Sequence, residues 1–235
     1  MKLKYKMLSS FLGLGLLPAL LVSLLSIQIS SNSLTSQAYN QLTSIRAIKQ
    51  SQIESYFAER KGDLDMLSEN VKRMMPVETE SDLSSVAHDL HDYFDQFIKA
   101  YSYYDLFVIN QSGDIVYTVA RESDYQTNLI HGAFKDSGLG RIFNKVVGSK
   151  RYQIEDFASY APSNGDPAAF IAKPVSINGV ELVLALQLSN EKIDAVMQQR
   201  DGMGETGETY LVGQDLRMRS NSFLDPVGHS VIASF

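Results

Sequence analysis

The sequence predicts an α+β protein with a long amino-terminal helix that begins in a membrane, followed by a domain built on one central antiparallel sheet. Three observations predict it. Residues 7–27 contain no charged side chain, and residues 32–75 contain no proline and carry apolar residues at helical spacing. Residues 104–188 contain β-rich runs separated by turn residues, and several of these runs follow one another without an intervening helix.

Charge is distributed unevenly along the 235 residues, which include 27 acidic and 21 basic side chains and no cysteine. Residues 1–53 contain five basic side chains and no acid, whereas the remainder holds 16 basic and 27 acidic side chains. The acidic body argues against nucleic-acid binding, because that function needs clustered lysine and arginine. The lack of cysteine excludes disulfides, thiolate nucleophiles and cysteine-based zinc sites.

The apolar segment at residues 7–27 predicts a transmembrane helix over residues 7–29. At 1.5 Å per residue it is long enough to cross a hydrocarbon core of about 30 Å. A long signal peptide is the alternative, but the apolar run exceeds the usual length of about 7–15 residues and no convincing small-residue cleavage pattern follows it. The tip at residues 1–6 carries Lys2, Lys4 and Lys6, so we expect it to stay cytoplasmic. The body would then be exported to the other side of the membrane.

A long stalk helix is predicted over residues 30–76, ended by Pro76. Its first half is rich in alanine, serine and glutamine, which suits a helix that gains partners by forming a homodimer. The alternative is packing along its own domain, and residues 53–75 favour that alternative. The apolar positions are Leu34, Ala38, Leu42, Ile45, Ile48, Ile53, Phe57, Leu64, Leu67, Val71 and Met74.

The folded body is predicted to begin at residue 77 and to form one complete module over residues 77–200. We expect a helix over 81–100, strands over 104–110, 114–119, 152–157, 168–175 and 180–188, and helices over 140–147 and 191–199. Gly113 and Asn178-Gly179 mark the hairpin turns.

A weaker repeat of the first hairpin follows in residues 201–235. Thr209–Gln214 is similar to Leu106–Asn110, and Leu216–Ser220 would be its return strand. We therefore expect the start of a second module here, and 235 residues to be part of a longer protein.

Several blocks of the sequence, in order, resemble the double Cache (PAS-like) extracellular sensor regions of bacterial chemoreceptors (methyl-accepting chemotaxis proteins) and of related sensor kinases and cyclases. The resemblance covers about residues 34–235. It implies a membrane-distal module, here about residues 80–190, that detects a ligand, and a membrane-proximal module after it. The blocks are YYDLFVINQSGDIVYTV at 103–119, ESDYQTNL at 122–129, YAPSNGDPAAFIAKPV at 160–175, LVLALQLSNEKIDAVM at 182–197 and GMGETGETYLVGQDLRMRS at 202–220.

Candidate ligand-binding residues cluster around the end of the predicted strand 114–119. Alternation of side chains would place Arg121 on one face with Tyr117 and Val119, where its planar guanidinium could bind a ligand carboxylate. The alternative for Arg121 is a surface salt bridge with Glu122 or Asp124.

The remaining candidates complete a pocket for a small solute such as an amino acid or a carboxylate. Tyr125 would form a wall together with Tyr117, while Asp124 and Asp156 would accept from an ammonium group. For Phe170, core packing is the favoured alternative. The candidate set is Tyr117, Arg121, Asp124, Tyr125, Asp156, Tyr160, Phe170 and Lys173.

Two further motifs are read as structural. Residues 202–207 match G-x-G-x-x-G, but a helical segment precedes them and a strand is expected after them, the reverse of the dinucleotide-binding arrangement. His88 and His91 are spaced to face one metal ion, yet two histidines make an incomplete site, and an exposed polar helix face is favoured. His131 and His229 are isolated. We predict no catalytic residues, no metal and no cofactor.

The sequence thus predicts the ligand-sensing region of a transmembrane signalling receptor, preferably a chemoreceptor. Alternatives are the sensory region of a membrane histidine kinase or nucleotide cyclase, a membrane-anchored periplasmic hydrolase, or a structural stalk protein.

Overall fold

The computed structural model describes residues 3–234, and the chain divides into two compact units, Met1–Ser51 and Gln52–Phe235. The helices are α1 (Leu3–Met74), α2 (Asp82–Asp89), α3 (His91–Tyr101), α4 (Gly138–Ser149), α5 (Glu191–Met197) and the short 3₁₀ turns η1 (Ala161–Ser163) and η2 (Ile232–Ser234). The strands are β1 (Asp105–Asn110), β2 (Ile115–Thr118), β3 (Gln153–Ser159), β4 (Pro167–Ile177) and β5 (Val180–Ser189). The predicted α+β class is confirmed.

In the described part of the first unit, residues 3–51, the chain is helical throughout. Its part of α1 has exposed apolar side chains and contains Pro18 without interruption of the helix. By length and composition this helix can cross a membrane, although a signal sequence near the amino terminus would satisfy the same criterion.

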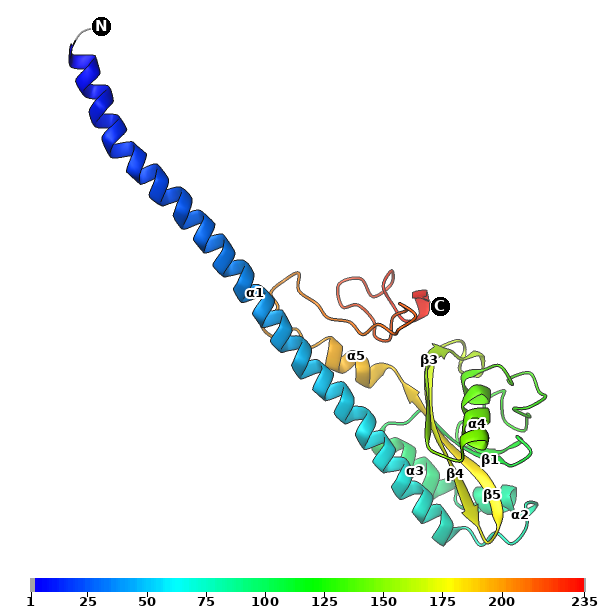
Figure 1. Ribbon diagram of the computed structural model, residues 1–235. Helices are drawn as coiled ribbons and strands as arrows, with labels where there is room; N and C mark the ends of the chain where they lie inside the picture. Colours follow the sequence, from blue (N-terminus) through cyan, green and yellow to red (C-terminus); the bar gives the residue numbers. More distant parts are fainter. Residues whose placement is uncertain (1–2, 235) are drawn as a thin grey trace. The chain divides into compact units, whose positions relative to one another are not determined.

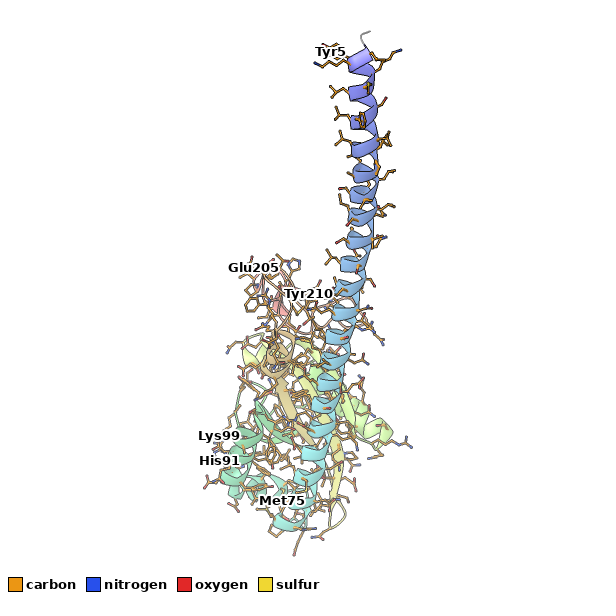
Figure 2. The ribbon with its side chains drawn as sticks, turned by 90° about the vertical axis from the view of Figure 1, so that its left-hand side faces the viewer. Tyr5, Met75, His91, Lys99, Glu205 and Tyr210 are labelled. Atoms are coloured by element: carbon orange, nitrogen blue, oxygen red, sulfur yellow. The ribbon has the colours of Figure 1, made fainter. Side chains whose placement is uncertain are left out.

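The second unit includes the last turns of α1, which pack on their own domain. Leu64, Leu67 and Val71 are fully buried in a core shared with the sheet. Their spacing of three and four residues places them on one face of the helix. The helix ends at Met74, shortly before Pro76, and Figure 2 labels Met75 at this end. Packing on the domain, the sequence alternative for residues 53–75, is therefore what the structure contains.

The five strands form one antiparallel sheet in the order β2-β1-β5-β4-β3. Its longest pairing joins β4 to β5, from Ala168 opposite Ser189 to Ile177 opposite Val180. Asn178 and Gly179 connect these strands with φ of 51° and 88°, the left-handed conformation that a two-residue hairpin turn requires. The turn predicted at these residues is confirmed.

The strands β1, β4 and β5 are buried on both faces, so they are largely apolar, whereas the edge strand β3 alternates between buried and exposed residues. In β1, Leu106 and Val108 face a core formed with α1, α2 and α3, while Phe107 and Ile109 face a second core formed with α4. Figure 1 shows α4 on one side of the sheet and α3 on the other. The side chain of Ser137 caps α4 by accepting from the N–H of Gly140 at 3.1 Å.

The helix predicted over residues 81–100 is instead two helices. Leu90 has φ −93° and ψ 12°, outside the helical region, and separates α2 from α3. A conformational break at one residue leaves the 3.6-residue periodicity almost unchanged, which is why the sequence pattern did not reveal it. His91 and Lys99, labelled in Figure 2, lie on α3.

The segment after α5 is largely irregular. The predicted hairpin over 209–220 is reduced to one antiparallel bridge between Val212 and Met218, and no strand is assigned in residues 198–234. In the glycine motif, Gly204 has φ 71°, and the guanidinium of Arg200 donates to the carbonyl oxygens of Gly204, Glu205 and Gly207. The motif therefore forms a loop around an arginine, and no helix follows it to bind a phosphate.

Candidate functional site

A series of hydrogen-bonded polar side chains at one end of the sheet begins at Tyr104, just before β1, and ends at Gln187 in β5. Tyr104 donates to Oε1 of Glu122 at 2.6 Å, and Ser163 donates to Oε2 of Glu122 at 2.7 Å. Nε2 of Gln187 in turn donates to the hydroxyl oxygen of Ser163 at 3.0 Å. The hydrogen bond to Glu122 raises the pKa of Tyr104, because it favours the protonated phenol.

The direction of these hydrogen bonds is fixed by Glu122. A carboxylate has only acceptors, so the single hydroxyl proton of Ser163 is used toward Glu122. Ser163 must then accept from Gln187, which orients the amide of Gln187 with its N–H₂ group toward Ser163. Oε1 of Gln187 is left without a hydrogen-bond partner among residues 3–234, although Gln187 is only 2% exposed. A buried acceptor without a donor is costly, and this one is therefore a candidate ligand contact.

A cavity of about 270 Å³ lies at this polar chain. It is lined by Tyr104, Ser163, Asp166, Pro167, Gln187, Ser189, Asn190, Glu191, Asn221 and Ile232. Asp166 and Glu191 are exposed, and neither carboxylate makes an ion pair within the described chain. The cavity thus combines a buried base of neutral hydrogen-bonding groups with two carboxylates that water can reach.

Asp105, which lies opposite Gln187 in the pairing of β1 with β5, is a fully buried carboxyl group. Oδ1 accepts from the backbone N–H groups of Val119 and Ala120 at 2.9 and 3.0 Å, and Oδ2 accepts from the hydroxyl of Thr118. Burial raises the pKa of Asp105 to about 7, and the nearby charge of Asp124 contributes in the same direction. The hydrogen bonds that backbone and side-chain donors make to this carboxyl group partly oppose this rise, because they stabilise the charged form.

Asp124 is the second buried carboxyl group. Its Oδ2 accepts from the hydroxyl of Tyr160 at 2.5 Å, while Oδ1 has no hydrogen-bond partner among the described residues. Burial raises the pKa of Asp124, the Tyr160 hydrogen bond opposes this, and Glu122 adds to it. The charge of Asp124 thus raises the pKa of Asp105, and the charge of Glu122 raises the pKa of Asp124.

Tyr117 and Tyr125, the two tyrosines expected to form one wall of the pocket, point their hydroxyls at histidines of α2 and α3. Tyr117 packs on the face of the sheet that α2 and α3 cover, where its hydroxyl lies 2.8 Å from Nδ1 of His91. The hydroxyl of Tyr125 lies 3.2 Å from Nε2 of His88. Tyr160 belongs to the core on the opposite face. The expectation of a single pocket containing Tyr117 and Tyr160 is therefore wrong, because the sheet lies between them.

His88 and His91 are half-buried and hydrogen-bonded, so the expected exposed polar face is also wrong. Nδ1 of His88 lies 2.6 Å from the carbonyl oxygen of Ser84, and Nε2 faces Tyr125. Within residues 3–234, no group of three or more metal-ligating side chains is found.

Arg121 does not share a face with Tyr117 as strand alternation would require. Strand β2 ends at Thr118, and Arg121 itself has φ 52°, so alternation stops before it. Its side chain is exposed, and the expected salt bridge is absent because Glu122 and Asp124 bind Tyr104, Ser163 and Tyr160 instead.

Three other candidates make contacts elsewhere. Asp156 pairs with Arg219 at 2.7 Å, and Lys173 pairs with Asp65 of α1 at 2.6 Å. Phe170 is buried against Tyr160, with ring centroids 5.0 Å apart, as the core-packing alternative predicted. Of the eight predicted residues, Asp124, Tyr160 and Phe170 come together, and none of the eight lines the cavity.

Gln187, Ser163 and Tyr104 were not identified from the sequence. Gln187 was the detectable one, since it is a polar amide in the middle of LVLALQLS, the apolar run of a strand buried on both faces. Such a residue requires partners inside the protein or from a ligand.

No protein-family profile and no curated protein sequence matches the chain. Solved structures do match its fold. The ligand-binding domain of the Pseudomonas aeruginosa amino acid chemoreceptor PctC, in complex with GABA, has a TM-score of 0.54 at 15% identity, over 76% of this chain and 74% of that one. The sensory domain of the Campylobacter jejuni chemoreceptor Tlp3 has a TM-score of 0.58 at 12% identity, over 82% and 75%.

A third match is the ligand-binding domain of the Pseudomonas fluorescens chemoreceptor CtaA in complex with L-serine. Its TM-score is 0.52 at 13% identity, and the match covers 78% of this chain and 71% of that one. All three neighbours are sensor domains with a sheet module like the one described above. Together with the long helix and the five-stranded antiparallel sheet, they show that this chain has the fold of the Cache sensor domains of bacterial chemoreceptors.

Proposed function

We propose that this chain is the ligand-sensing region of a membrane-anchored signalling receptor, preferably a chemoreceptor, and that it binds a small solute in the cavity at Gln187. The observation that carries the proposal is the unpartnered Oε1 of this 2% exposed side chain at a cavity of about 270 Å³. A hydrogen-bond donor from a ligand would satisfy it.

The fold supports a sensory role in preference to a hydrolase or a passive stalk. Two of the similar structures are complexes, PctC with GABA and CtaA with L-serine, so domains of this fold accommodate small polar molecules. The hydroxyls at the cavity are hydrogen-bonded to the carboxylate of Glu122, and no histidine or lysine takes part in these hydrogen bonds to activate them further.

The anchor and the signal follow from α1. We propose that its apolar part spans the inner membrane with the lysine-rich tip in the cytoplasm, and that the body is periplasmic. A homodimer through the alanine- and serine-rich stalk would let a ligand-dependent change in the domain shift one helix against its partner. Sedimentation of the detergent-solubilised chain tests this: a monomer at all concentrations would contradict the dimer.

The ligand site is tested by thermal unfolding of the full detergent-solubilised chain with a library of amino acids, amines, carboxylates and small sugars. A compound at 100 times its Kd stabilises the folded state by about 2.7 kcal/mol. We expect stabilisation of the wild type and of Gln111→Met, a control in the exposed β1–β2 turn, and its loss in Gln187→Met. Absence of any stabilising compound, or equal stabilisation of Gln187→Met, would contradict the proposal.

A further inference from the structure

We infer that the cavity at Gln187 binds a small organic cation, with an ammonium or guanidinium group, and rejects carboxylates. This inference rests on the proposed ligand site and adds the chemical class of the ligand.

The first argument is that the unpartnered atom of Gln187 is an acceptor and not a donor. Glu122 fixes the direction of the hydrogen bonds. Ser163 donates its hydroxyl proton to Glu122, and Gln187 donates an N–H to Ser163. What remains at Gln187 without a protein partner is an acceptor, Oε1. A ligand that reaches Oε1 must supply an N–H or O–H donor to it, and an ionised carboxylate has none.

The second argument is the charge of the lining. Asp166 and Glu191 are the ionisable carboxylates among the lining residues, and no lysine, arginine or histidine of the described chain lines the cavity. Glu122 adds a third carboxylate directly behind Ser163. A carboxylate ligand would meet this negative field with no compensating cation, while a cation would be attracted by it.

The position of Arg121 removes the reason to expect a carboxylate ligand. It is the arginine that the sequence suggested for that role, but it is exposed, follows β2 in a left-handed conformation and is absent from the cavity lining.

The size of the cavity restricts the ligand further. A volume of about 270 Å³ lies just below the range of about 300–1,000 Å³ that is usual for small-molecule pockets. A small compound such as a short amine or diamine therefore suits it better than a peptide.

The inference is tested with matched pairs of probes on the full detergent-solubilised chain. Propylamine, 1,4-diaminobutane and guanidinium are compared with propanoate and butanedioate, and butane-1,4-diol serves as the neutral donor. Binding is measured by thermal shift and by calorimetry at low and at high salt. We expect the cations to bind, the diol to bind more weakly and the carboxylates not to bind. Added salt should weaken the binding of the cations, because Asp166 and Glu191 are exposed to solvent, where salt screens their charges.

Substitutions locate the binding. Gln187→Met removes the acceptor at similar volume, and we expect the Kd for the diamine to rise at least tenfold, as for the loss of a hydrogen bond to a charged group. Glu191→Gln should raise it about two- to fivefold. The control, Glu181→Gln, changes a carboxylate toward the other end of β5 and should leave the Kd unchanged.

Each contrary result has a distinct meaning. If butanedioate or propanoate binds and Gln187→Met abolishes that binding, the cavity remains the ligand site and the cationic class is wrong. If no cation binds, or if cations bind Gln187→Met as tightly as the wild type, the inference is overturned. The proposed sensory function fails only if the wider library also produces no compound that depends on Gln187.

Discussion

The hydroxyl of Tyr160 donates a 2.5 Å hydrogen bond to Oδ2 of Asp124, and both side chains are buried. Asp124 follows β2, whereas Tyr160 follows β3 at the opposite edge of the sheet. The bond therefore ties together two connecting segments that come from the two edge strands. It also supplies the hydrogen bond that limits the cost of placing a carboxyl group in the core beside Phe170.

Replacing Tyr160 with phenylalanine should destabilise the fold. Asp124 would lose its Oδ2 partner while Oδ1 already lacks one, and we expect a loss of about 1–3 kcal/mol in the free energy of unfolding by urea. The loss should grow as pH rises, because the hydrogen bond no longer holds down the pKa of Asp124. Tyr152→Phe is the matched control, since the buried hydroxyl of Tyr152 has no partner in residues 3–234. Equal losses in both variants would contradict a specific role for the Tyr160 hydroxyl.

Asp105 should make the folded state less stable as pH rises. Its folded pKa of about 7 lies above the ordinary value of 3.8, so the folded protein binds the proton more tightly than the unfolded chain. The stability that results is complete below about pH 4 and is lost as pH rises through 7. Between pH 5 and pH 8 this amounts to on the order of 3 kcal/mol as an upper bound. In Asp105→Asn, urea unfolding at the two pH values should lack this difference, and a slope equal to the wild type would be evidence against it.

Two glycines of α4 should respond oppositely to alanine. A Cβ at Gly140 would overlap the carbonyl oxygens of Phe134 and Lys135, so we expect Gly140→Ala to cost about 1–3 kcal/mol. Gly148 has open space around its Cβ position, and alanine there should stabilise the helix by up to about 1 kcal/mol. Thermal unfolding of the two variants measures both effects, and destabilisation by Gly148→Ala would contradict the second.

Arg219 should hold the irregular segment after α5 against the sheet. It is 6% exposed and pairs with Asp156 of β3 and with Asp215, at 2.7 and 2.9 Å. In Arg219→Met both carboxylates lose this cation, and we expect faster cleavage within residues 202–234 in limited proteolysis. Arg151→Met, a change at an exposed arginine before β3, is the control and should be cleaved at the wild-type rate.

The regular elements were predictable because their signals are local and repeated. β4 and β5 are long apolar runs on either side of Asn178-Gly179, and the turn chemistry sets their register. The helix predicted over residues 81–100 is divided by the conformation of Leu90 alone, and the spacing of apolar residues does not reveal such a break. The shortened second hairpin also escaped prediction, since pairing of strands depends on neighbours as well as on sequence.

The candidate site was harder to predict because it depends on side chains from distant segments. Alternation along the strand was extended to Arg121, although β2 ends three residues earlier. Asp156 and Lys173 have partners 63 and 108 residues away in sequence, which residue type cannot indicate. The contact between Asp124 and Tyr160 was not predicted either, because it joins the segments that follow the two edge strands, 36 residues apart in sequence.

The absence of cysteine provides a way to observe the β4–β5 hairpin in the working protein. Strand β5 runs from the turn, where Asn178 donates to the carbonyl oxygen of Val77 at 3.0 Å, to Gln187 at the cavity. From Val180 to Gln187 this is about 24 Å of paired strand. Ser176 is exposed beside the turn, so Ser176→Cys would be the one thiol in the chain and would accept a single fluorescent label. A dye at that position would show whether binding at the cavity is transmitted along the strand to the turn.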